Sequence, residues 1–154
     1  MGIEKLVMLS IIIPHYNSAD LLVKLLSTIP DIPEIEVIVV DDHSTQKLDE
    51  LLRCKQEYGN RNIFFFENPP NKKSAGAARN MGMKHAKGKY LLFADADDWF
   101  MENFWRVVEE YIVDGADIIF FVPTSSKMDG REARRHLHYR KLIKEYLRDT
   151  SYRN

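Results

Sequence analysis

The stretch LLFADADDWF, residues 91–100, joins an apolar run directly to three carboxylates within four residues. Because residues 90–94 are apolar throughout, they predict a short strand that is buried on both faces. Asp95, Asp97 and Asp98 follow its carboxyl end, which is where ligands bind in open α/β sheets. Like charges this close repel one another unless a cation or a proton relieves them. The pattern predicts a divalent metal site at Asp95 and Asp97; the alternative is a solvated turn in which Asp98 caps the next helix.

The rest of the chain alternates strand and helix patterns around this stretch. Runs rich in Ile, Leu, Val and Phe predict further strands at residues 6–13, 35–40, 63–66 and 117–122. Helical spacing of apolar residues predicts a first helix through Leu21, Leu22, Leu25 and Leu26, and a second through Leu48, Leu51 and Leu52. Small residues mark a third helix at residues 75–86, and a fourth covers about residues 101–113. This alternation is typical of an α/β fold with a mostly parallel sheet flanked by helices on both faces.

Right-handed crossovers bring the carboxyl ends of parallel strands to one edge of the sheet. That edge collects residues 14–17, 41–44 and 67–74 together with the acids after residue 94. Asp42 can accept a hydrogen bond from an N–H group of a base such as uracil, and Tyr16 can stack on that base. The alternative for Asp42 is a turn in which it caps the following helix.

Three cations lie near the start of the small-residue helix, namely Lys72, Lys73 and Arg79. Cations and free backbone N–H groups at a helix start favour phosphate, although in isolation these side chains would form a solvated basic surface. Combined with a base pocket and a metal site, they describe a nucleoside diphosphate held with Mg²⁺ or Mn²⁺. Such a metal would neutralise the diphosphate as it leaves.

Composition limits the class of protein. The 154 residues are 45% hydrophobic and 29% charged, which suits one soluble globular domain. A formal net charge of −1 argues against generic nucleic-acid binding. Cys54 is the single cysteine, so an internal disulfide and a multi-cysteine zinc site are excluded and a cytoplasmic setting is expected. The longest apolar run, residues 6–13, is too short to span a bilayer.

Four ordered blocks resemble family 2 glycosyltransferases: SIIIPHYN at residues 10–17, VIVVDDHS at 37–44, GAARNMG at 76–82 and GKYLLFADADDW at 88–99. The resemblance implies a Rossmann-like GT-A fold that binds a nucleotide-diphospho-sugar. It implies an inverting transferase that moves a sugar, from a UDP-sugar donor, to the hydroxyl of a saccharide or lipid-linked saccharide acceptor in cell-surface polysaccharide synthesis. The implied nucleotide site is Pro14, Tyr16, Asn17, Asp42, Arg79 and Asp95, and the implied Mn²⁺ or Mg²⁺ ligands are Asp97 and Asp95.

One part of the family pattern is missing from this sequence. Family members usually continue into an acceptor-binding half that supplies an Asp or Glu base, and no such block follows Val122. We therefore expect a nucleotide-sugar and metal-binding core at residues 1–122 and, at residues 123–154, the start of the acceptor-binding half. The alternatives are a truncated module that binds nucleotide without transferring sugar and, more remotely, a receiver-like signalling domain, in which the acid pair would follow the first strand.

The segment after residue 126 differs in charge from the rest. Residues 1–126 have a formal net charge of −6 and residues 127–154 one of +5. Apolar residues spaced among the basic ones at residues 131–147 predict an amphipathic basic helix. We expect this helix to pack on the acidic body; the alternative is a peripheral contact with the inner face of the membrane.

Overall fold

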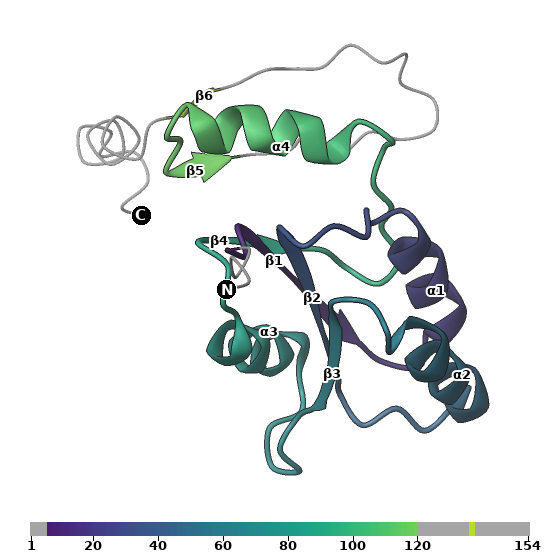
Figure 1. Ribbon diagram of the computed structural model, residues 1–154. Coiled ribbons are helices and arrows are strands. Elements are labelled where there is room, and N and C mark those ends of the chain that lie inside the picture. Colours follow the sequence, from purple (N-terminus) through teal and green to yellow (C-terminus); the bar gives the residue numbers. More distant parts are fainter. Residues whose placement is uncertain (1–5, 120–135, 138–154) are drawn as a thin grey trace, which may run out of the picture. The chain divides into compact units, whose positions relative to one another are not determined.

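The computed structural model describes residues 6–119 and 136–137. The chain divides into two compact units, residues 1–102 and residues 103–154 (Figure 1). Among the described residues, no helix has both the length and the apolar character needed to cross a membrane. The predicted boundary after residue 122 lies outside the described residues.

The first unit is built on a four-stranded sheet. Strands β1 (Leu9–His15), β2 (Ile35–Asp41), β3 (Ile63–Glu67) and β4 (Tyr90–Phe93) are all parallel to their neighbours, in the order β3-β2-β1-β4. Helices α1 (Ala19–Ser27), α2 (Leu48–Tyr58) and α3 (Ala75–His85) make the crossovers. The predicted α/β fold with a parallel sheet is therefore confirmed. Four of the predicted apolar runs form its strands, and the predicted helices between them cover the sheet.

The two faces of the sheet are covered by different helices. Figure 1 shows α3 on one side of the sheet and α1 and α2 on the other. On the α3 side, Ala78 packs with Ile38 and Val40 in a buried cluster. A Cβ atom added to Gly82 would lie 2.4 Å from Cγ2 of Ile12, so α3 approaches β1 more closely than a helix with a larger residue there could. The small residues Ala78 and Gly82 thus let α3 lie close against the sheet.

A buried carboxylate fixes the turn that leads into β4. Oε1 of Glu36 accepts hydrogen bonds from Ser10 Oγ at 2.5 Å and from the backbone N–H groups of Lys87 at 2.5 Å and Gly88 at 3.2 Å. Gly88 lies so close to β1 that a Cβ atom on it would be 2.6 Å from the Ser10 nitrogen. This network sets where β4 begins, and hence where the acids after β4 lie.

The structure corrects the prediction that residues 90–94 are buried on both faces. Leu91 and Phe93 are 44% and 46% exposed. Among the described strands, β4 pairs with β1 alone and forms an edge of the sheet. No described strand pairs with the outer edge of β4, and α3 packs mainly on β1 and β2. An apolar run by itself does not distinguish a central strand from an edge strand.

The inner face of α2 also differs from the prediction. Leu48 and Leu52 are 54% and 55% exposed, whereas Leu51, Cys54 and Tyr58 are buried. The buried residues follow the i, i+3, i+7 spacing of one helical stripe. Three closely spaced leucines fit two possible stripes, and contact with the rest of the protein selected the one through Cys54 and Tyr58.

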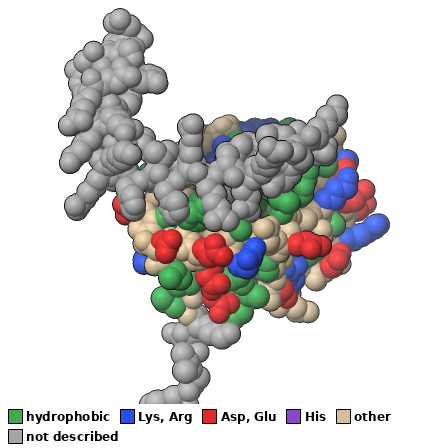
Figure 2. Space-filling view, turned by 90° about the horizontal axis from the view of Figure 1, so that it is seen from above, with side chains coloured by type: hydrophobic (Ala, Val, Ile, Leu, Met, Phe, Trp, Pro, Cys, Tyr) green, Lys and Arg blue, Asp and Glu red, His purple; other side chains and the backbone are tan. Residues whose placement is uncertain are grey.

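The second unit contains α4 (Phe104–Val113) and the short strands β5 (Ile118–Ile119) and β6 (His136–Leu137). β5 pairs with β6 in an antiparallel two-stranded sheet. The predicted fifth strand at residues 117–122 is therefore confirmed at residues 118–119, although this strand does not pair with the described parallel sheet, and residues 120–122 lie outside the described part. The predicted basic helix at residues 131–147 is wrong at residues 136–137, which are extended; its other residues lie outside the described part. Where side chains are coloured in Figure 2, acidic and basic groups are interspersed with hydrophobic ones.

Candidate nucleotide and metal site

A cleft of about 440 Å³ opens at the carboxyl edge of the parallel sheet. The register of the sheet pairs His15 with Asp41 and Asp41 with Glu67, which brings the ends of β1, β2 and β3 level. The cleft is lined from these strand ends, the start of α3 and the segment after β4, by Pro14, His15, Tyr16, Ser18, Leu21, Asp42, Ala75, Arg79, Asp95, Ala96 and Asp97. Five of the six residues expected at the nucleotide site line it, together with both expected metal ligands.

Asp42 is a buried carboxylate whose surroundings fix its orientation. Its Oδ1 atom accepts hydrogen bonds from Asn68 Nδ2 at 2.7 Å and from the Ser74 backbone N–H at 3.2 Å. Asp42 thereby holds both ends of the loop between β3 and α3. Its other oxygen, Oδ2, makes no hydrogen bond to a described residue, and Asp42 lines the cleft. Asp42 can therefore accept a hydrogen bond from a ligand.

Asn68 is a site residue that the sequence reasoning missed. An ionised carboxylate only accepts hydrogen bonds, so the Asn68 amide nitrogen must face Asp42. The Asn68 Oδ1 atom is then buried and has no hydrogen-bond partner among the described residues. The available signal was its position directly after β3: Asp41 pairs with Glu67, and Asp42 and Asn68 are the next residues of the two segments.

Asp41 joins the ends of β1 and β2. Its Oδ1 atom accepts a hydrogen bond from His15 Nδ1 at 2.7 Å, while the Ser44 backbone N–H donates to its Oδ2 atom at 3.0 Å. Burial raises the pKa of Asp41, but the hydrogen bonds from His15 and Ser44 outweigh this effect and lower the pKa from 3.8 to about 2. His15 Nε2 accepts from the Ser18 N–H at 3.3 Å, so the ring carries its proton on Nδ1. Both groups are engaged within the protein.

Asn17 also serves to connect two loops. It adopts a left-handed conformation with φ of 53°. Its Oδ1 atom accepts hydrogen bonds from the backbone N–H groups of Thr45 at 2.7 Å and Gln46 at 2.9 Å, and its own N–H donates to Ser44 Oγ at 2.8 Å. Asn17 is not among the residues that line the cleft. Its side-chain oxygen therefore positions the loops after β1 and β2.

The acids after β4 have three different surroundings. Asp95 forms an ion pair with Arg79, with 2.5 Å between Oδ1 and Nη2. Asp98 Oδ2 accepts a hydrogen bond from the Asp95 backbone N–H at 2.9 Å, so Asp98 closes the turn. It does not cap α4, whose N-cap residue is Asn103. Asp97 is exposed and makes no hydrogen bond or ion pair with a described residue.

The acids of the cleft suit a metal that is shared with a ligand. Among the described residues, no group of three or more His, Cys, Asp or Glu side chains could hold an ion by itself. Mg²⁺ and Mn²⁺ are often held by one or two carboxylates together with substrate phosphates and water. Asp97 and the second oxygen of Asp95 supply donors of this kind in the cleft. The residues therefore fit a metal that binds together with a diphosphate.

Comparisons with known proteins found related sequences and structures. The family model described as glycosyl transferase family 2 matches residues 10–154. The poly(ribitol-phosphate) beta-glucosyltransferase of Bacillus spizizenii is 42% identical over 96 residues, which are 59% of this chain and 15% of that protein. The poly(ribitol-phosphate) beta-N-acetylglucosaminyltransferase TarS of Staphylococcus aureus is 38% identical over 95 residues, which are 58% of this chain and 16% of that protein. The chain thus spans about a sixth of the length of these relatives.

Solved structures show the same fold. The crystal structure of S. aureus TarS 1–349 has a TM-score of 0.69 at 29% identity, over 80% of this chain and 38% of that one. The same protein in complex with UDP-GlcNAc has a TM-score of 0.61 at 32% identity, over 70% of this chain and 31% of that one. The mannosyltransferase PcManGT of Pyrobaculum calidifontis, in complex with GDP-Man and Mn²⁺, has a TM-score of 0.61 at 23% identity, over 70% of this chain and 33% of that one. At that identity the likeness shows the fold alone.

Proposed function

The chain belongs to glycosyl transferase family 2, and from this premise we propose that its cleft binds a UDP-sugar as the donor of an inverting glycosyltransferase. The acceptor is the hydroxyl of a saccharide or lipid-linked saccharide in the synthesis of a cell-surface polysaccharide. The observation that carries the proposal is the meeting of Asp42, Tyr16, Asp95 and Asp97 in one cleft, from three distant parts of the sequence. The complexes of TarS with UDP-GlcNAc and with UDP support the choice of uridine.

Asp42 and Tyr16 would hold the base. The free oxygen of Asp42 accepts the imide N–H of uracil, and its fixed orientation means that little conformational freedom is lost on binding. Tyr16 is 47% exposed at the cleft, so its ring offers a stacking surface. Asn68, through the amide that orients Asp42, is a positioning residue for this contact.

Arg79 and the start of α3 would bind the diphosphate. Ser74 caps α3 by accepting a hydrogen bond from the Ala77 N–H at 3.1 Å, and the helix start favours negative charge. Arg79 lines the cleft and already pairs with Asp95, so it can bridge that acid and a phosphate oxygen. Asp97 and Asp95 would hold Mn²⁺ or Mg²⁺, which, when bound, supplies Lewis-acid neutralisation of the departing diphosphate.

A nucleotide-binding role without sugar transfer is the second candidate. Transfer needs a general base within hydrogen-bond reach of the acceptor hydroxyl. The carboxylates that line the cleft, within the described residues, are Asp42, Asp95 and Asp97, and each already has a role in binding the donor. This candidate predicts that the chain binds the donor as tightly as an active glycosyltransferase would, but transfers no sugar.

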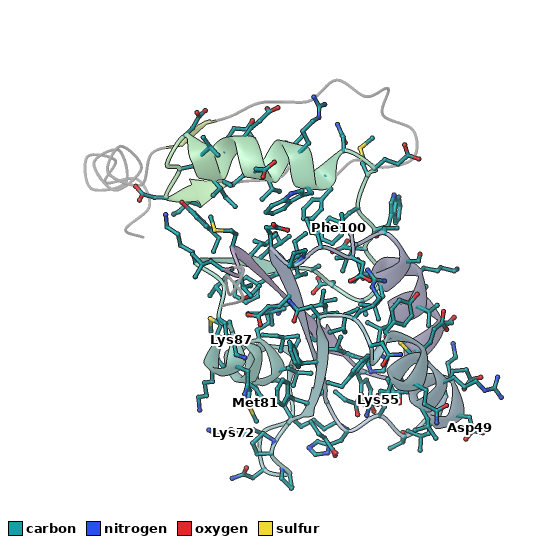
Figure 3. The ribbon with its side chains drawn as sticks, in the orientation of Figure 1. Asp49, Lys55, Lys72, Met81, Lys87 and Phe100 are labelled. Carbon is teal, nitrogen blue, oxygen red and sulfur yellow. The ribbon has the colours of Figure 1, made fainter. Side chains whose placement is uncertain are left out.

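The proposal is tested by isothermal titration of the full chain with UDP, GDP and uridine, in Mn²⁺ and in chelator. We expect UDP to bind more tightly with Mn²⁺, and Asp97→Asn to remove this dependence without changing the melting temperature, because Asp97 is exposed and unpaired among the described residues. Asp49→Asn, on α2 (Figure 3) and not among the residues that line the cleft, is the matched control and should bind as wild type. Equal affinity for UDP with Mn²⁺ and with chelator would reject the metal site.

A further inference from the structure

The ammonium group of Lys73 lies over the ring of Tyr16, with Nζ 4.7 Å from the ring centroid. Tyr16 lines the cleft at the end of β1, whereas Lys73 belongs to the loop between β3 and α3. We propose that Lys73 is a further nucleotide-binding residue, which covers the Tyr16 ring in the free protein and moves to the donor diphosphate when a base stacks on that ring. This inference rests on the proposed function and adds a residue to its donor site.

The backbone at Lys73 is held in place beside the cleft. The next residue, Ser74, donates its N–H to Asp42 at 3.2 Å and caps α3. At the other end of the loop, Asn68 is bound both to the Asp41 carbonyl through its N–H and to the Asp42 carboxylate through its amide. Only the lysine side chain, which is long and flexible, has to move. The proposed change therefore needs no rearrangement of the loop.

The charges of the cleft leave a role for another cation. Three carboxylates and one guanidinium line the cleft, a formal charge of −2, and that guanidinium, on Arg79, is already paired with Asp95. A diphosphate would add further negative charge. Lys73 is exposed and forms no ion pair with a described carboxylate, so its charge remains available. Its position one residue before the N-cap of α3 places it beside the helix start proposed to bind the diphosphate.

Lys72 provides a comparison within the same loop. It is also exposed, and its backbone N–H donates to the Pro69 carbonyl at 2.9 Å. Its side chain lies on the loop below α3 (Figure 3), with no contact to an aromatic ring of the cleft. The two lysines thus have the same charge and similar exposure, but Lys73 alone of the two reaches a residue that lines the cleft.

Base and ammonium would compete for the same ring. Stacking of a nucleobase on an aromatic side chain is generally stronger than an exposed cation–π contact, so the base displaces the ammonium. For a nucleoside without phosphate, Lys73 is therefore a competitor. For a nucleoside diphosphate, the displaced ammonium gains a phosphate partner and adds to the affinity.

The test compares Lys73→Met and Lys72→Met with the wild-type full chain by isothermal titration with uridine and with UDP, in Mn²⁺. We expect Lys73→Met to weaken UDP binding by about three- to tenfold, and to leave uridine binding unchanged or tighten it by up to about threefold. The affinity of Lys73→Met for UDP should also depend less on salt. Lys72→Met should change either affinity by less than about twofold, and both variants should melt as wild type because both side chains are exposed.

Two results would overturn the inference while leaving the proposed function intact: a wild-type affinity of Lys73→Met for UDP, or an equal loss for UDP and uridine. The second would mean that Lys73 supports the base pocket and does not contact the phosphates. If the wild-type chain bound neither UDP nor GDP, the proposed function and this inference would fail together.

Discussion

Ser10 donates a hydrogen bond of 2.5 Å to Glu36 inside the sheet, between the adjacent strands β1 and β2. Both side chains are almost completely buried, and the same carboxylate oxygen accepts the N–H groups of Lys87 and Gly88. A buried carboxyl group costs little stability here because hydrogen bonds satisfy its Oε1 atom. The network connects the core of the sheet to the start of β4, so the acids of the cleft depend on a contact at the opposite end of that strand.

Replacing Glu36 should therefore destabilise the fold. Glu36→Ala leaves the buried Ser10 hydroxyl and the Lys87 N–H without their acceptor, whereas the Gly88 N–H keeps Ser10 Oγ at 2.8 Å. We expect the free energy of unfolding to fall by about 2–5 kcal/mol. Glu36→Gln keeps one acceptor and should lose less. Urea unfolding measures both, with exposed Glu57→Ala on α2 as control. A loss of less than about 0.5 kcal/mol in Glu36→Ala would show that the network is not stabilising.

Two glycines of α3 should respond to alanine with opposite signs. In Gly82→Ala the new Cβ would meet Ile12 Cγ2 at 2.4 Å, and such overpacking costs about 1–3 kcal/mol. In Gly76→Ala the nearest atom is Ser74 Oγ at 3.8 Å, so the higher helix propensity of alanine should stabilise by up to about 1 kcal/mol. Thermal unfolding distinguishes the two. Ile12→Ala, which removes Cγ2, should cost less stability in the Gly82→Ala background than in wild type; an equal cost in the two backgrounds would argue against the contact.

Asp41 should make stability depend on pH in the acid range. Its pKa in the folded protein is lowered from 3.8 to about 2, so the folded state favours the ionised form. The resulting stabilisation, about 2 kcal/mol, is complete well above pH 3.8 and is lost as the pH falls from there towards 2. Wild type should therefore exceed Asp41→Asn in unfolding free energy near neutral pH, and the gap should narrow in acid. A gap that stays constant down to about pH 2.5 would contradict this assignment.

Replacing Asp42 and replacing Asp97 should weaken the binding of different parts of the nucleotide. Asp42→Asn removes the acceptor proposed for the base, so uridine and UDP should both bind about 10- to 100-fold more weakly. Asp97→Asn should leave the affinity for uridine as in wild type. It should weaken UDP binding only when Mn²⁺ is present. Titration calorimetry with both ligands gives the comparison, and melting temperatures check that Asp42→Asn still folds. If Asp42→Asn bound uridine as wild type does, the base would have to lie elsewhere.

Long-range pairing decided several features that local patterns leave open. Residues 90–94 look like a strand buried on both faces and residues 117–122 like a fifth strand, yet β4 is an edge strand in the described sheet and Ile118 pairs antiparallel with Leu137 in a separate sheet. Leu48, Leu51 and Leu52 fit more than one helical stripe, and only Leu51 is buried. Which apolar residue meets water depends on neighbours that are distant in the chain, and periodicity carries no information about them.

The sequence by itself determined the parallel α/β architecture and the edge at which the site forms, because unbroken apolar strands, helical crossovers and right-handed connections leave few other arrangements. It also identified Tyr16, Asp42, Arg79, Asp95 and Asp97, which do line one cleft. Only the tertiary structure revealed that Asn68 orients Asp42, that Asn17 joins two loops and that Lys73 rests on Tyr16. These roles are set by hydrogen bonds and ring contacts between residues brought together by the strand register, and such geometry exists only after the chain has folded.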